Sequence, residues 1–158
     1  MAAQSHYWKQ LLLRQVPVLD RLGALQRWNE ASSVKLEESV VLAFYTIRKL
    51  INSFLLDQRL VHQPIRMTVF PVRHGVGPLM GDEPFGTLYD LDSGHAAAHD
   101  LLFLCHQVTG NCLFEPCFST DQKLRGIYFT SDHQRKAGLY CLDIESLREI
   151  LQHVGKSR

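Results

Sequence analysis

The strongest constraint on the fold is a long amphipathic stretch in the first third of the chain. Between Ser33 and Leu55, apolar residues recur every three or four positions, which is the spacing of one face of an α-helix. These residues are Leu36, Val40, Ala43, Phe44, Ile47, Ile51, Phe54 and Leu55. A helix with such a stripe buries it against other elements. We therefore predict a helix over about 33–56 at the centre of the core, with Phe44 and Ile47 almost fully buried.

Two shorter helices are predicted before this stretch. Ser5 is suited to cap a helix over about 5–16. Pro17 ends that helix, because proline lacks a backbone N–H and disfavours helix in the residue before it. The same proline can open a second helix over about 18–28, whose apolar residues share one face. The polar run that follows, 29–33, is typical of a turn and a helix cap.

The apolar period changes from about 3.6 residues to two after Pro64, which indicates a strand over about 65–71. A glycine- and proline-rich loop over about 73–91 follows, and it is longer than most connections in compact domains. The remaining elements are predicted as a helix over about 93–109, strands over about 112–118, 124–130 and 138–142, and a helix over about 144–154.

This order of elements predicts a single α+β domain over residues 1–158. N-terminal antiparallel helices pack on a small antiparallel sheet, a further helix precedes a three-stranded meander, and a C-terminal helix follows. With 158 residues, 46% of them hydrophobic, the chain is long and apolar enough to bury its own core without disulfides.

Charge is balanced over the whole chain, with 17 lysines and arginines against 16 aspartates and glutamates. The molecule as a whole therefore has no electrostatic tendency toward nucleic acid or anionic lipid. Residues 74–122 nevertheless contain no lysine or arginine. The acidic residues of this span are Asp82, Glu83, Asp90, Asp92, Asp100, Glu115 and Asp121. We predict that the span contributes an interface with a protein partner or a second copy of the chain, through Asp82, Glu83, Asp90 and His106.

Histidines recur at helical spacing inside the same span. On the predicted helix, His95, His99 and His106 lie on the solvent side, and Asp92 lies one turn earlier. His95 and His99 are spaced to share a divalent metal ion such as Zn²⁺, with Asp92 as a further ligand. His106 is two turns away, about 10 Å along the axis, and is too far to join them. Alanine replaces the glutamate of H-E-x-x-H, so no general base is implied.

The N-terminal helices carry a group of cations suited to contacting phosphates. These residues are Arg14, Arg21, Arg27, Arg48 and Lys49. No aromatic stacking partners lie between them and no docking motif accompanies them, so the group is more typical of a solvated helix face.

The cysteines and the apolar runs indicate a cytoplasmic protein outside the membrane. The cysteines, which have apolar neighbours and no C-x-x-C pair, are predicted to be small core residues: Cys105, Cys112, Cys117 and Cys141. No apolar run approaches the roughly 20 residues that span a bilayer. The first residues also lack the basic and apolar regions of a secretory signal.

The leading functional prediction is a non-catalytic binding or regulatory module that acts through protein contacts. Every catalytic template lacks at least one residue that it requires. Two alternatives stay open. One is a metal-dependent hydrolase or nuclease centred on Asp92, His95 and His99, and the other is a nucleic-acid-binding protein that uses the N-terminal cations. A divalent metal ion such as Zn²⁺ is the one cofactor that the sequence suggests.

Overall fold

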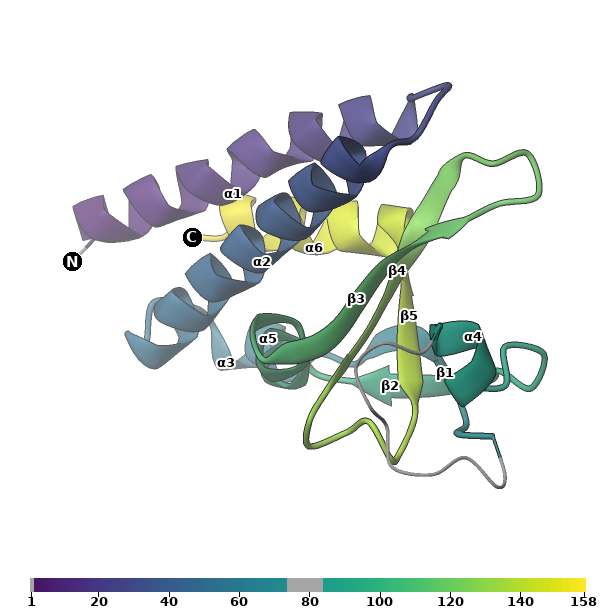
Figure 1. The fold of residues 1–158 in the computed structure, drawn as a ribbon. Coiled ribbons are helices and arrows are strands. Elements are labelled where there is room, and N and C mark those ends of the chain that lie inside the picture. Colours follow the sequence, from purple (N-terminus) through teal and green to yellow (C-terminus); the bar gives the residue numbers. More distant parts are fainter. Residues whose placement is uncertain (1, 74–83) are drawn as a thin grey trace.

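A five-stranded antiparallel sheet lies beneath a layer of helices in the computed structural model, which describes residues 2–73 and 84–158 (Figure 1). The strand order is β2-β1-β5-β4-β3. The strands are β1 Ile65–Phe70, β2 His95–His99, β3 Asn111–Phe118, β4 Leu124–Ser131 and β5 Leu139–Asp143. The helices are α1 Ala2–Gly23, α2 Glu30–Asn52, α5 Leu101–Thr109 and α6 Ile144–Lys156, with single turns α3 Gln58–Val61 and α4 Phe85–Leu88. The predicted α+β class is confirmed.

The long helix α2 lies at the centre of the core, as its apolar stripe predicts. Phe44 and Ile47 are both 0% exposed, which confirms their predicted burial. The helix begins at Glu30, before the predicted start, because the Asn29 side chain accepts a hydrogen bond from the backbone N–H of Ser32 (2.9 Å). Ser32 in turn lies near the backbone N–H of Asn29, which completes a capping box. The predicted end of the helix at about 56 is wrong, because α2 ends at Asn52. Phe54, which belongs to the predicted stripe, lies beyond this end with a positive φ of 58° and is 86% exposed.

The predicted break at Pro17 is wrong, because α1 is a single helix that contains this proline and ends at Gly23. Proline inside a helix costs about 3 kcal/mol. The buried face of α1, which includes Leu12, Val16 and Leu19, packs on the core on both sides of the proline. Most helical stability in proteins comes from such packing, and here it outweighs the local cost.

The predicted helix over 93–109 is also wrong in its first half, which forms the edge strand β2. His95–His99 pairs with β1 in antiparallel register, with Ala97 opposite Met67. Helix begins only at Leu101, where the Asp100 side chain accepts a hydrogen bond from the backbone N–H of Phe103 (2.9 Å). Alanine favours helix, and pairing with β1 overrides that local preference.

The second face of the sheet is covered by part of the predicted 73–91 loop. Residues 74–83 of that loop lie outside the described residues. Tyr89 pairs with Val72 in an isolated bridge and donates a hydrogen bond from its hydroxyl to the Arg135 carbonyl (2.7 Å). Leu88, Tyr89 and Leu139 form a small cluster there, separate from the main core.

Candidate functional site

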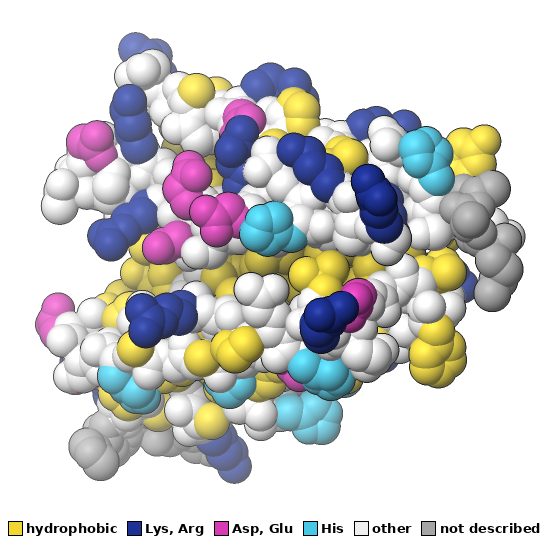
Figure 2. Space-filling model, turned by 180° about the vertical axis from the view of Figure 1, so that it is seen from behind, with side chains coloured by type: hydrophobic (Ala, Val, Ile, Leu, Met, Phe, Trp, Pro, Cys, Tyr) yellow, Lys and Arg dark blue, Asp and Glu magenta, His cyan; other side chains and the backbone are white. Residues whose placement is uncertain are grey.

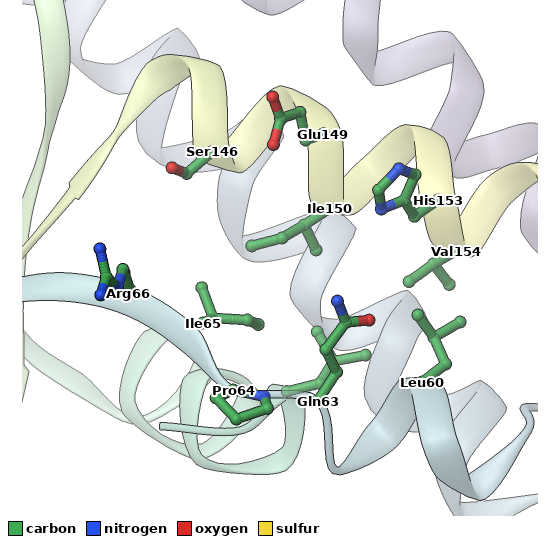
Figure 3. Close-up of a pocket in the computed structure, with 11 residues that line it drawn as sticks. Leu60, Gln63, Pro64, Ile65, Arg66, Ser146, Glu149, Ile150, His153 and Val154 are labelled. Atoms are coloured by element: carbon green, nitrogen blue, oxygen red, sulfur yellow. The ribbon is translucent and has the colours of Figure 1, made fainter. Parts of the chain in front are cut away.

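A groove of about 250 Å³ lies between α6 and the segment that joins α3 to β1 (Figure 3). Its floor is apolar and is formed by Leu60, Ile65, Leu101, Ile150 and Val154. On the face shown in Figure 2, a hollow with a hydrophobic floor runs between two walls that carry charged and histidine side chains. The groove is therefore amphipathic in cross-section.

One wall of the groove is a row of polar residues on α6. Ser146, Glu149 and His153 are spaced by three and four positions, so they lie along one side of the helix over about 10 Å. Ile150 and Val154 occupy the adjacent row and are buried. The strong amphipathicity of α6 thus places a polar rim directly beside an apolar floor.

The opposite wall comes from the residues around the start of β1. Gln63 and Pro64 precede the strand, and Arg66 is its second residue. Figure 3 shows Arg66 toward the end of the groove where Ser146 lies, and Gln63 nearer to the end where Val154 lies. Pro64 disfavours helix at Gln63 and so helps to end the preceding turn before the strand begins.

The polar side chains of the groove are without polar partners in the described part of the structure. Within residues 2–73 and 84–158, none of these side chains has a hydrogen bond or ion pair with another residue: Gln63, Arg66, Ser146, Glu149 and His153. Arg148, on another side of α6, by contrast donates a hydrogen bond to the Asp20 carboxylate of α1 (2.9 Å). The groove therefore presents a cation, an anion, an imidazole, a hydroxyl and an amide to solvent.

The helical geometry predicted for the metal site is wrong. His95 and His99 lie four residues apart on a strand, so their Cα atoms are about 13 Å apart and the two rings cannot ligate one ion together. His99 instead stacks on Phe103 with ring centroids 3.7 Å apart, and burial lowers its pKa. Asp92 is exposed in the turn before β2. No group of three or more histidine, cysteine, aspartate or glutamate side chains in the described part of the chain is arranged to hold a metal ion.

The predicted acidic interface is only partly described. Asp82 and Glu83 lie outside the described residues. Asp90 holds the turn before β2, where it accepts hydrogen bonds from the Ser93 hydroxyl (2.7 Å) and the Asp92 backbone N–H (3.1 Å), which lower its pKa. His106 is exposed on α5.

Other acidic residues of the same span lie elsewhere in the fold. Asp100 caps α5, whereas Glu115 lies on β3, at the opposite edge of the sheet from β2. Asp121 lies in the β3–β4 turn, where Ser119 donates a hydrogen bond to it. The described acidic residues are thus distributed over both edges of the sheet rather than gathered on one face.

The predicted cations are distributed over α1, α2 and the connection between them. Arg14 and Arg21 are exposed, seven residues apart on α1, and Arg27 lies in the connection to α2. Lys49 is exposed on α2, whereas Arg48 is half-buried near the Cys105 thiol of α5. Of these five side chains, Arg48 alone is not exposed.

The four cysteines are all free, and one of them fits the prediction of a core residue fully. Cys105 is buried, and desolvation raises its pKa to about 12. Cys112 is exposed, contrary to the prediction. Cys117 on β3 is half-buried, and hydrogen bonds from the Cys141 thiol and then the Tyr128 hydroxyl lower its pKa, with burial acting against them. The sequence does not reveal the contact between Cys117, Tyr128 and Cys141, because these residues lie on three different strands.

Fold and groove together define an α+β protein with an open amphipathic groove beside its last helix. No family model, curated protein or solved structure matches the chain. Among the described helices, none combines the length and apolarity needed to cross a bilayer.

Proposed function

We propose that this protein is a non-catalytic protein-binding module whose groove receives an apolar side chain of a partner protein. The observation that carries the proposal is the ring of polar side chains, unpaired within the described structure, around an apolar floor. Interfaces of this kind bury one anchor residue in a pocket and surround it with polar contacts.

The size of the groove favours a side chain over a free small molecule. Its volume of about 250 Å³ lies below the roughly 300–1,000 Å³ of pockets that enclose drug-sized ligands. One aliphatic or aromatic side chain fits such a volume, and its flanking backbone then lies along the rim.

The charges of the rim specify the neighbours of the anchor residue. Arg66 offers a planar guanidinium, which forms paired hydrogen bonds with a carboxylate. Glu149 on the opposite wall accepts hydrogen bonds from backbone N–H groups or from a basic side chain. The partner segment that fits best has an apolar residue with an aspartate or glutamate beside it on the Arg66 side.

Mixed charge on the rim also favours a protein partner over nucleic acid. Phosphate recognition relies on several cations acting together, and each phosphate contact adds to the salt dependence of binding. The groove carries Glu149 together with Arg66, so its charges do not reinforce each other toward a polyanion.

An array of short peptides tests this proposal directly. Each peptide carries one leucine or phenylalanine flanked by acidic, basic or uncharged residues, and binding to the purified protein is measured. We expect the acidic set to bind best. Arg66→Glu weakens that binding roughly tenfold or more, because a charge-assisted contact becomes a repulsion.

Two controls test whether the peptides bind in the groove. Replacing the acidic residue of a binding peptide by lysine should restore binding to the Arg66→Glu protein. Lys123→Glu, an exposed change in the β3–β4 turn, should leave binding unchanged. Absence of any binding peptide, or equal binding by the wild-type and Arg66→Glu proteins, refutes the proposed function.

A further inference from the structure

Strand β2 is an open edge of the sheet. It is the outermost strand and pairs on one side only, with β1. Its outward-facing backbone N–H and C=O groups have no backbone partner within residues 2–73 and 84–158. Such a row of unpaired groups is a template for another strand, unless the edge is protected by proline, lysine or a bulge. β2 contains none of the three.

The opposite edge, β3, is protected in several ways. Pro116 removes one backbone N–H from this strand. Its register with β4 is irregular at two places, between Asn111 and Leu113 and between Cys117 and Phe118. Helix α2 also runs beside β3, where burial and the nearby Glu37 carboxylate raise the pKa of Glu115. Of the two edge strands of the sheet, β2 is therefore the one that lacks these protective features.

The sequence of β2 reads the same in both directions, as His95-Ala96-Ala97-Ala98-His99. Two copies of such a strand match when they run antiparallel with Ala97 on a two-fold axis. His95 then faces the His99 of the second copy, and Ala96 faces its Ala98. The side chains at the centre are methyl groups, which leave the backbones free to approach to the usual strand spacing of about 4.8 Å.

We propose that β2 is a self-association surface, on which two copies of this chain join their sheets through antiparallel β2–β2 pairing. The interface is isologous, because the same five residues serve both copies, and closed two-fold pairs are the commonest arrangement of identical chains. Main-chain hydrogen bonds supply the attraction, as in other strand additions.

The dimer is expected to be weak and concentration-dependent. A five-residue strand buries far less than the roughly 1,200–2,000 Å² of stable protein interfaces. The pairing uses a surface and an occupant that differ from those of the groove, so it stands or falls independently of the proposed function.

Sedimentation equilibrium of the full chain over about 1 µM to 1 mM covers the range expected for an interface of this size. Ala96 and Ala98 are exposed, so both positions accept charged residues without loss of the fold. The double variant Ala96→Glu, Ala98→Glu places like charges opposite each other across the axis and should weaken the dimer by roughly tenfold. Its matched control, Ala96→Lys, Ala98→Glu, places opposite charges there and should preserve or strengthen the dimer.

The stability of the dimer in the wild-type protein and in the two variants shows whether the two copies associate through β2 or through another surface. A wild-type dimer that is weakened roughly tenfold in the first variant and retained in the second supports the proposal. Slower amide exchange in β2 at high protein concentration, seen in wild type and absent in the first variant, supports it as well. A protein that is monomeric at every concentration overturns the proposal, including the case in which the edge takes a foreign strand. A dimer equally stable in both variants, or lost in both, also overturns it.

Discussion

The ammonium group of Lys9 donates a hydrogen bond to the backbone carbonyl of Ser157 (3.1 Å), which joins the first helix to the end of the last. Lys9 is only 7% exposed, and a cation at the carboxyl end of a helix interacts favourably with the helix dipole. This contact is one of the polar links between α1 and α6, together with the Arg148–Asp20 ion pair.

Replacing Lys9 by methionine keeps most of the side-chain volume and removes the charge. We expect Lys9→Met to lower the free energy of unfolding by about 1–3 kcal/mol, because a charge-assisted hydrogen bond is lost at a buried position. Urea denaturation measures the change. Lys156→Met, at an exposed position of α6, is the control and should stay within about 0.5 kcal/mol of wild type. Equal stability of the two variants would contradict the role given to Lys9.

Phe44 is one of the largest fully buried side chains, so its truncation tests where the core lies. Its ring is fully buried at the centre of α2, so Phe44→Ala leaves a cavity and should cost about 3–5 kcal/mol. Thermal or urea unfolding checks this value. Tyr45→Ala on the exposed side of the same helix, where the side chain is 63% exposed, should cost far less. A loss below about 1 kcal/mol for Phe44→Ala would show that the core is centred elsewhere.

His99 is expected to make stability depend on pH. Burial lowers its pKa in the folded protein below the value near 6.5 of the unfolded chain, so folding favours the neutral ring. Its contribution is complete above about pH 7 and is lost as the pH falls from about 6.5 through the lower folded pKa. His99→Phe retains the stack on Phe103 and should flatten the stability profile between pH 5 and 7. Identical wild-type and His99→Phe profiles would refute this prediction.

Cys117 is expected to react faster than the other thiols. Hydrogen bonds from Cys141 and Tyr128 lower the pKa of Cys117. Partial desolvation instead raises the pKa of Cys112, which lies at the surface. The rate of Cys117 alkylation by iodoacetamide, followed by peptide mass spectrometry, should reach half its maximum below about pH 8, the lower end of the range of ordinary thiols. Tyr128→Phe should move this midpoint upward. A wild-type midpoint above about pH 8 would be that of an ordinary thiol.

The elements predicted best from the sequence are those whose signals are local. The stripe of α2 predicts its own burial, because a helix that carries it has one face to cover. The predicted strands over 112–118, 124–130 and 138–142 agree with β3, β4 and β5 to within a few residues, since alternating β-formers and a polar turn are also local signals. The helix predicted over 93–109 is wrong in its first half, because the helical spacing of His95, His99 and His106 is a coincidence.

The parts that could not be predicted depend on contacts distant in the sequence. Pairing of His95–His99 with β1 involves residues about 30 positions earlier, and no local pattern reveals it. The groove combines residues from 60–66, from Leu101 and from 146–154. The sequence predicts the apolar stripe of α6, but it does not reveal that residues 60–66 lie opposite this helix. Ser146, Glu149 and His153 beside that stripe were the one signal of a polar rim.

Occupation of the groove is tested most directly by an NMR titration. The ¹⁵N-labelled protein is titrated with a binding peptide from the array, and amide shifts are followed through the described residues. We predict shifts concentrated at Ile65, Arg66 and Ser146–Val154, which collapse in Arg66→Glu and return with the lysine-substituted peptide. Shifts centred on another surface, such as the β3–β4 turn, or no shifts at any peptide concentration, would contradict a partner-binding groove beside α6.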